Sequence, residues 1–263
     1  MMKNVLAALL MLAAPASAHE FWIEPHDFQV PGGAPVVADV RVGEAFGGSA
    51  FTFNPRNFRR FDLVMGPNAM PVEGRIGDRP ALSMPAPSDG LAVIVHETSD
   101  MYIKYSMEGQ FENFLTHKDW LPLLDVHKSR GLPEIGFVER YSRYGKSLVA
   151  VGDGAGADRV VGLTTEIVAL ANPYTEDLSE MPVQVFYEDA PRPEAQVELF
   201  EKAPDGEVAV TYHRTDADGI ARLPVKAGHA YLVDAVVIRE MKALEEDDPV
   251  WESLWASLTF ALP

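Results

Sequence analysis

The chain has 263 residues and is strongly acidic, with 39 aspartates and glutamates against 22 lysines and arginines and a formal net charge of −17 at pH 7. This acidity argues against nucleic acids and anionic membrane surfaces as partners. The sequence contains no cysteine, which excludes disulfides, thiolate metal sites and thiol catalysis.

The first 18 residues predict a cleavable export leader. A lysine lies among the first four residues, an apolar run covers 5–14, and Ala16-Ser17-Ala18 fits the small-x-small pattern that precedes a signal-peptidase site. The run is too short for a transmembrane helix, which needs about 20 apolar residues. We therefore expect an exported, periplasmic protein that is cleaved after Ala18, begins at His19 and is not inserted in a membrane.

Residues 19–162 are predicted to form a first β domain. Runs rich in apolar and β-branched residues lie at 36–42, 61–65, 91–97 and 101–105. Segments containing glycine and proline separate them at strand-like spacing. This alternation of short strands and turns is typical of an antiparallel sandwich.

A helical insert is predicted at about 108–145, where the β pattern is interrupted. Phe111, Phe114 and Leu115 have the i, i+3, i+4 spacing of one helix face. We expect residues 139–145 to form a short helix or a tight coil at the end of this insert.

Residues 163–263 are predicted to form a second domain with an immunoglobulin-like sandwich. Seven short strands in about a hundred residues is the number that such a sandwich requires. The expected fold class is therefore all-β, with two immunoglobulin-like antiparallel sandwich domains and a short helical insert in or after the first. The seven predicted strands are 164–170, 182–188, 195–201, 208–214, 220–225, 229–239 and 253–261.

The last of these strands has a clear two-residue period. Leu254, Ala256, Leu258 and Phe260 share one face, whereas the residues between them share the other. We expect this strand to seal the core of the second domain. We also expect the second domain to pack independently of the first.

A family resemblance is carried by residues 19–25 at the mature start, by 139–149 at the centre, and by 195–200, 215–219 and 251–260 in the second half. These segments resemble the bacterial family known as domain of unknown function DUF4198, which includes periplasmic proteins related to nickel and cobalt uptake components. It implies a periplasmic, all-β, two-domain protein associated with transition-metal acquisition. This chain lacks the terminal transmembrane helix of the membrane-bound members, which favours a soluble binding or delivery role.

His19 is the first candidate metal ligand, because a histidine at a free N-terminus offers both its α-amine and its imidazole Nδ1 to one ion. These groups titrate near pH 8 and 6.5, so a borderline divalent metal displaces their protons at neutral pH. The square-planar motif built on backbone amides needs a histidine at the third mature position, where this chain has Phe21. A terminal site must therefore be completed from elsewhere in the fold, with Glu20 and Glu24 as acceptors that orient a ligand ring or as simple surface charges. The alternative is that His19 merely follows the cleavage site.

His96 and His26 are the candidates to complete this site. His96 ends the most apolar predicted strand, and the family resemblance makes it the position to pair with the terminal histidine. His26 follows His19 by seven residues and could approach it across a turn at Pro25. The alternative for His96 is a ring at the edge of the core, hydrogen-bonded to a backbone carbonyl.

The other four histidines are not expected to bind metal. His117 and His127 lack the spacing of ligands on one helix face, and we expect both to be solvated. His213 and His229 fall on predicted strands and are expected to be structural or exposed.

A basic and aromatic segment stands out in this acidic protein. Phe51 and Phe53 alternate along a possible strand and are followed by Arg56, Arg59 and Arg60. The segment is interpreted as a surface loop, with a partner-facing surface as the alternative.

These observations predict a soluble periplasmic accessory protein that binds a divalent transition metal, either nickel, cobalt or copper, for uptake or handling. Its expected partners are the metal ion and a metal permease or an outer-membrane receptor, and not nucleic acid. Neither Gly-x-Ser-x-Gly nor His-Glu-x-x-His occurs in the sequence, so we do not expect an enzyme. The alternative is a non-metal interaction module of the envelope that binds a protein partner or a glycan. A copper-dependent oxidase that uses two histidines and the terminal amine is a third possibility.

Overall fold

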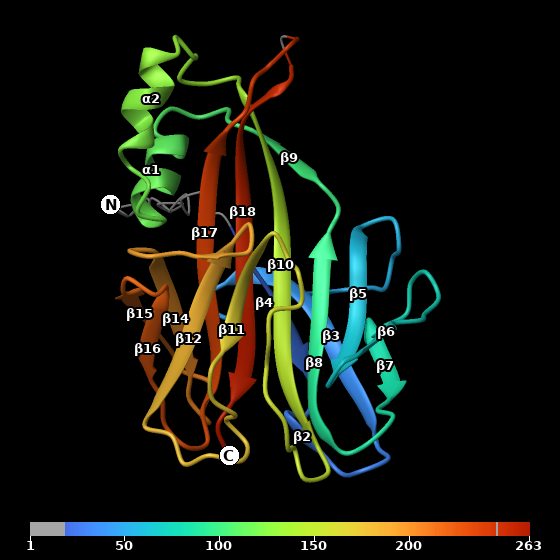
Figure 1. Ribbon diagram of the computed structural model, residues 1–263. Helices are drawn as coiled ribbons and strands as arrows, with labels where there is room; N and C mark the ends of the chain where they lie inside the picture. The colour runs from blue at the N-terminus through green and yellow to red at the C-terminus, as the bar shows by residue number, and fades with distance from the viewer. Residues whose placement is uncertain (1–18, 246) are drawn as a thin grey trace, which may run out of the picture.

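The computed structural model describes residues 19–245 and 247–263, so the predicted leader, residues 1–18, lies outside the described residues. The described chain forms three stacked sheets and two short helices (Figure 1). The all-β sandwich predicted from the sequence is confirmed. Neither helix has the length and apolarity that a membrane crossing requires.

The largest sheet, here called the central sheet, has ten strands and runs through both halves of the chain. Its strands β2 (Gln29–Val30) and β9 (Met101–Lys104) both pair with β10. The remaining strands are, in spatial order, β15 (Val208–Arg214), β14 (Gln196–Lys202), β17 (Ala230–Glu240), β18 (Pro249–Ala261), β10 (Val138–Val151), β8 (Gly90–Thr98), β5 (Phe58–Met65) and β6 (Asn68–Pro71).

The second sheet, here called the N-terminal sheet, packs on one face of the central sheet. The even positions Ala92 and Ile94 of β8 face it and share a buried core with Ile23 and Val36. Figure 1 shows β3 and β4 behind the central sheet. The N-terminal sheet consists of β1 (Glu20–Pro25), β3 (Pro35–Glu44), β4 (Gly47–Phe51) and β7 (Leu82–Pro85).

The third sheet, here called the C-terminal sheet, covers the opposite face of the central sheet. The odd positions Val93 and Val95 of β8 belong to its core, together with Leu258 and Phe260 of β18. Figure 1 shows β11 and β12 in front of the central sheet. The seven strands predicted after residue 163 correspond to strands of the structure. The C-terminal sheet consists of β11 (Thr165–Ala169), β12 (Glu180–Tyr187), β13 (Ala190–Pro191) and β16 (Ile220–Pro224).

The two helices, α1 (Gln110–His117) and α2 (Leu123–Ser129), confirm the predicted insert. They pack on the same face as the N-terminal sheet, where Phe111 contacts Trp251 with ring centroids 5.7 Å apart. The expectation of a helix or coil over 139–145 is wrong, because Val138–Val151 is one continuous strand. Most of its polar side chains are buried inside the protein, which conceals the apolar period that marks a strand.

The predicted boundary between residues 162 and 163 falls within a fold whose halves share one sheet. Strand β10 from the first half pairs in parallel with β18 from the second, from Val138 to Ser147. The main core also combines Tyr144 and Leu148 of β10 with residues of the second half. Whether residues 163–263 pack independently stays a prediction.

Candidate functional site

A pocket of about 510 Å³ opens at one end of the core between the N-terminal and central sheets. His19 lines it from the residue before β1, and His96 lines it from the end of β8. These two residues are 77 positions apart in the chain and come together because β1 and β8 belong to sheets that pack face to face. The structure therefore places the two principal predicted ligands on one pocket.

His96 contributes a buried, neutral imidazole to this pocket. The ring is 5 % exposed and lies among Phe21, Phe58 and Phe61, with ring centroids 5.2, 5.3 and 4.9 Å away. Burial among these apolar rings lowers the pKa of His96 to about 3, because the charged form would lose its hydration. Nδ1 is buried and has no hydrogen-bond partner within the described chain. The alternative for His96 is a ring at the edge of the core that is hydrogen-bonded to a backbone carbonyl. That alternative does not account for Nδ1, which has no such partner among the described residues.

His19 lies at the rim of the pocket and is exposed. A guanidinium nitrogen of Arg143 on β10 donates a hydrogen bond to the His19 carbonyl oxygen at 3.1 Å. The imidazole Nε2 of His19 is 3.8 Å from Oε1 of Glu44, and both side chains are about half exposed. The backbone of His19 is thus held by a buried arginine, while its imidazole stays accessible.

His26 does not belong to this pocket. Its Nε2 lies 3.4 Å from Oδ2 of Asp39, and the same carboxylate oxygen accepts a hydrogen bond from Arg41 at 3.2 Å. His26 is not among the residues that line the pocket. Of the three predicted ligands, the structure therefore brings His19 and His96 together and leaves His26 in a polar pair elsewhere.

The expectation that His127 is solvated is wrong, since the residue is 3 % exposed. Its Nε2 lies 2.9 Å from the carbonyl oxygen of Pro133, and its Nδ1 accepts a hydrogen bond from Nε1 of Trp251 at 3.0 Å. The ring therefore donates through Nε2 and fastens α2 to β18. His213 and His229 are partly exposed on or beside strands, as expected for structural histidines.

The basic and aromatic segment after residue 50 contributes to the pocket. Phe51, Phe53 and Arg56 line it, a position that the interpretation as a surface loop did not include. The alternation of Phe51 and Phe53 was the signal that could have indicated it. Tyr141 and Arg143 of β10 also line the pocket, and the sequence gives no signal for them because the pattern of residues 139–145 does not indicate a strand.

No curated protein sequence matches this chain. Among solved structures, a tetra-tandem repeat in the extending region of a large adhesion protein aligns with 11 % sequence identity and a TM-score of 0.19. That alignment covers 93 % of this chain and 50 % of the other, so the chain spans about half of its length. The family model of domain of unknown function DUF4198 matches residues 16–239. The chain belongs to the DUF4198 family.

Proposed function

We propose that this protein is exported, is cleaved after Ala18, and binds one divalent transition metal ion at the pocket lined by His19 and His96. The observation that carries the proposal is the presence of both histidines on one pocket, although they are distant in sequence. Export is supported by the leader pattern of residues 1–18. Binding, and not catalysis, is the proposed role.

The available donors suit nickel, cobalt or copper. After cleavage His19 supplies an α-amine and an imidazole, and His96 supplies a second imidazole. Nitrogen ligands of this kind are preferred by the later divalent transition metals. His96 offers a nitrogen that is buried, neutral and without a hydrogen-bond partner in the described chain, so a metal ion would satisfy an otherwise orphaned group.

Arg143 supports this arrangement by positioning the new N-terminus. Its hydrogen bond to the His19 carbonyl holds the backbone beside the pocket and leaves the α-amine and imidazole to act as donors. The guanidinium is itself buried, and burial lowers the pKa of Arg143. It therefore acts as a positioning residue for His19.

The physiological role that we propose is metal capture and delivery in the periplasm, with a metal permease or an outer-membrane receptor as the partner. The resemblance to nickel and cobalt uptake components supports this role. A soluble carrier needs a site that opens to solvent for exchange, and the exposed imidazole of His19 meets that need.

The alternative, a module that binds a glycan or a protein partner, is favoured by the size of the pocket. A volume of about 510 Å³ is far larger than one ion needs. Its walls carry the aromatic rings on which sugars and other organic ligands pack. These rings belong to Phe21, Phe51, Phe53, Phe58, Phe61 and Tyr141.

Calorimetric titration with Ni²⁺, Co²⁺ and Cu²⁺ tests the proposal on protein that begins at His19. We expect one equivalent to bind at the pocket, and the affinity to fall by at least about tenfold in His96→Phe, which keeps an aromatic ring but removes the nitrogen ligand. A chain extended by one methionine before His19 should lose affinity similarly, because its α-amine is no longer on the histidine.

His26→Ala is the matched control, since it removes a histidine near the N-terminus that is not on the pocket. It should bind metal as the native chain does. Equal affinities of the native, methionine-extended and His96→Phe proteins would overturn the proposal and favour the non-metal alternative.

A further inference from the structure

A second cluster of ionisable side chains lies where four distant segments meet. Glu20 comes from β1, His117 and Lys118 from the end of α1, Glu198 from β14 and Asp234 from β17. Glu198 and Asp234 occupy the even positions of their strands, so they point to the face of the central sheet that carries the helices. None of these residues lines the pocket of His19 and His96.

The three carboxylates are buried more completely than carboxylates usually are. Glu20, Glu198 and Asp234 are 3, 2 and 1 % exposed. Burial raises the pKa of Glu20 to about 7 and that of Asp234 to about 6, although Lys118 opposes both shifts. Carboxylates in this position need cationic partners, because an uncompensated buried charge is costly.

Lys118 satisfies only part of that need. Its buried ammonium lies 2.9 Å from Oε1 of Glu198, 3.1 Å from Oδ2 of Asp234 and 3.9 Å from Oε1 of Glu20. The second oxygen of each carboxylate, namely Oε2 of Glu198, Oδ1 of Asp234 and Oε2 of Glu20, is buried and accepts no hydrogen bond from the described residues. The lysine therefore leaves one oxygen of every carboxylate that it contacts without a hydrogen bond, and the one on Glu198 has only an ion pair with His117 within the described chain.

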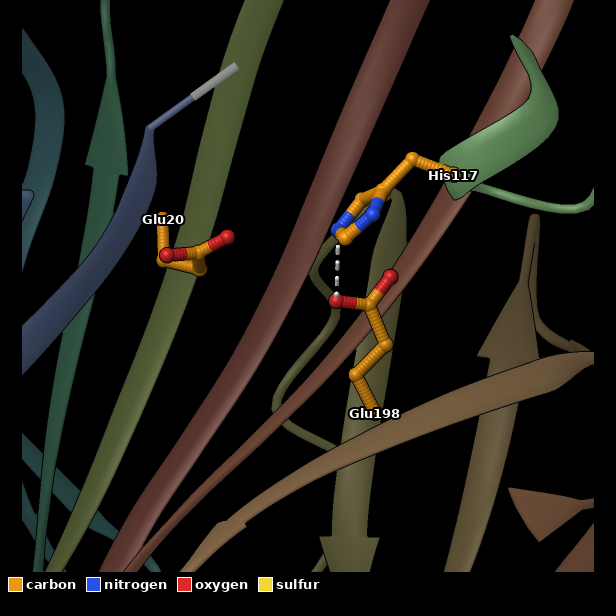
Figure 2. Close-up of side chains that lie close together, drawn as sticks. All are labelled: Glu20, His117 and Glu198. Carbon is orange, nitrogen blue, oxygen red and sulfur yellow. Dashed lines mark ion pairs between the residues drawn. The ribbon is translucent and has the colours of Figure 1, made fainter. Parts of the chain in front are cut away.

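His117 faces two of these carboxylates from the solvent side. Its Nε2 is 3.4 Å from Oε2 of Glu198, and its side chain is 43 % exposed. Figure 2 shows this ion pair, with the Glu20 side chain extending towards it from β1. One ligand atom each of Glu20, His117 and Glu198 lies within 4.8 Å of the other two.

We propose that Glu20, His117 and Glu198 form a second cation site, which binds a divalent metal ion of the zinc class. Two carboxylate oxygens and one imidazole nitrogen are a usual ligand set for such an ion, with solvent completing the coordination. A tetrahedral ion with bonds of about 2.0–2.2 Å needs ligand atoms roughly 3.4 Å apart, which is the His117–Glu198 separation, so Glu20 must move closer by at most about 1.4 Å.

The buried lysine is compatible with the ion. Lys118 holds Oε1 of Glu198 and Oδ2 of Asp234, whereas the atoms left for the metal are the opposite oxygens of Glu20 and Glu198. Within 4.0 Å of the three carboxylates, the described chain places no cation other than Lys118 and His117. A divalent ion would supply the missing positive charge, and it would tie β1 to the end of α1 and to β14.

Zinc titration tests this site on a methionine-extended His96→Phe chain, in which both the free terminal histidine and the His96 ligand are absent. We expect this background protein to bind one equivalent of Zn²⁺. Adding His117→Ala, or Glu20→Gln, should lower the affinity by at least about tenfold. His117 is half exposed, so its replacement should leave the fold intact.

His213→Ala in the same background is the matched control, because His213 is a partly exposed strand histidine outside the cluster. It should bind zinc as the background does. Zinc should also shift the imidazole ¹⁵N resonances of His117 and not those of His213.

A background protein that binds no zinc, or one whose affinity is unchanged by His117→Ala, would overturn the second site. The result is independent of the proposed function. Zinc binding in the background together with nickel binding that is insensitive to His96→Phe would support the second site and refute the first.

Discussion

At the scale of single residues, Lys146 shows how a buried charge can hold this fold together. Its side chain is fully buried, and its ammonium lies 2.8 Å from Asp158 and 2.9 Å from Glu166. Glu166 also accepts hydrogen bonds from the backbone amides of Val161 and Leu163. The triad links β10 to the segment that leads into β11.

Lys146→Met should therefore be strongly destabilising. The substitution leaves two buried carboxylates without their cation, which typically costs 3–5 kcal/mol, so we expect a loss of about 4 kcal/mol in the free energy of unfolding. Guanidinium denaturation of the native protein and the variant measures this loss.

The matched control is Lys226→Met, which breaks the exposed pair with Glu201, a 2.7 Å contact made by a lysine that is 66 % exposed. Its cost should stay below about 1 kcal/mol. Similar losses for the two variants would show that the Lys146 triad does not stabilise the fold.

At the scale of elements, Glu139 joins β10 to its neighbours. Tyr105, in the segment after β9, donates a hydrogen bond to Oε2 at 2.7 Å, and Ser253 of β18 donates one to Oε1. The side chain is buried, and burial raises the pKa of Glu139 to about 7, against the opposing effect of the two hydrogen bonds. This polar residue of β10 is thus satisfied by side chains from neighbouring segments of the chain.

Glu139→Gln should change how stability depends on pH. The folded state holds a proton on Glu139 up to about pH 7, whereas the unfolded state releases it near 4.5. The folded state therefore binds more protons than the unfolded state between these two pH values. In the protein with Glu139, the free energy of unfolding should fall as the pH rises from 4.5 to 7, and it should level off above pH 7. We expect this group to contribute about 3 kcal/mol to the fall.

The glutamine variant keeps the shape but cannot titrate, so the difference between the two proteins isolates this group. Urea denaturation at several pH values measures the free energy of unfolding of both proteins. Parallel profiles for the two proteins would contradict a raised pKa at Glu139.

At the scale of the whole molecule, β18 holds the two halves together. It lies between β17 and β10, with both faces buried. Phe260 on one face is fully buried, which contributes on the order of 2 kcal/mol by apolar transfer. Trp255 on the other face packs against the helices, where its ring stacks on Phe114 at 5.7 Å.

We therefore expect the mature chain to unfold in one cooperative transition, with equal calorimetric and van't Hoff enthalpies. Removal of residues 251–263 should abolish that transition, because it takes away the strand that joins β17 to β10. A shortened chain that melts at the temperature of the full chain would contradict this. A fragment of residues 163–263 that melts cooperatively by itself would instead support the domain boundary predicted from the sequence.

The sequence by itself determined most of the strands, because the two-residue period is a local property of the chain. Leu254, Ala256, Leu258 and Phe260 share the face predicted for them and lie in the main core. The same reasoning failed for residues 139–145. A buried strand with polar side chains is recognisable only once their partners, such as Ser253 for Glu139, are known.

The candidate sites divide in the same way. The leader pattern and the end of an apolar strand pointed to His19 and His96, and the structure places both on one pocket. Only the tertiary structure decided that His26 pairs with Asp39 instead, since no local pattern specifies which residue a turn will face. The cluster around Lys118 has no signature in the sequence at all. Its members come from β1, α1, β14 and β17, and they meet only because β1 and the end of α1 pack on the same face of the central sheet.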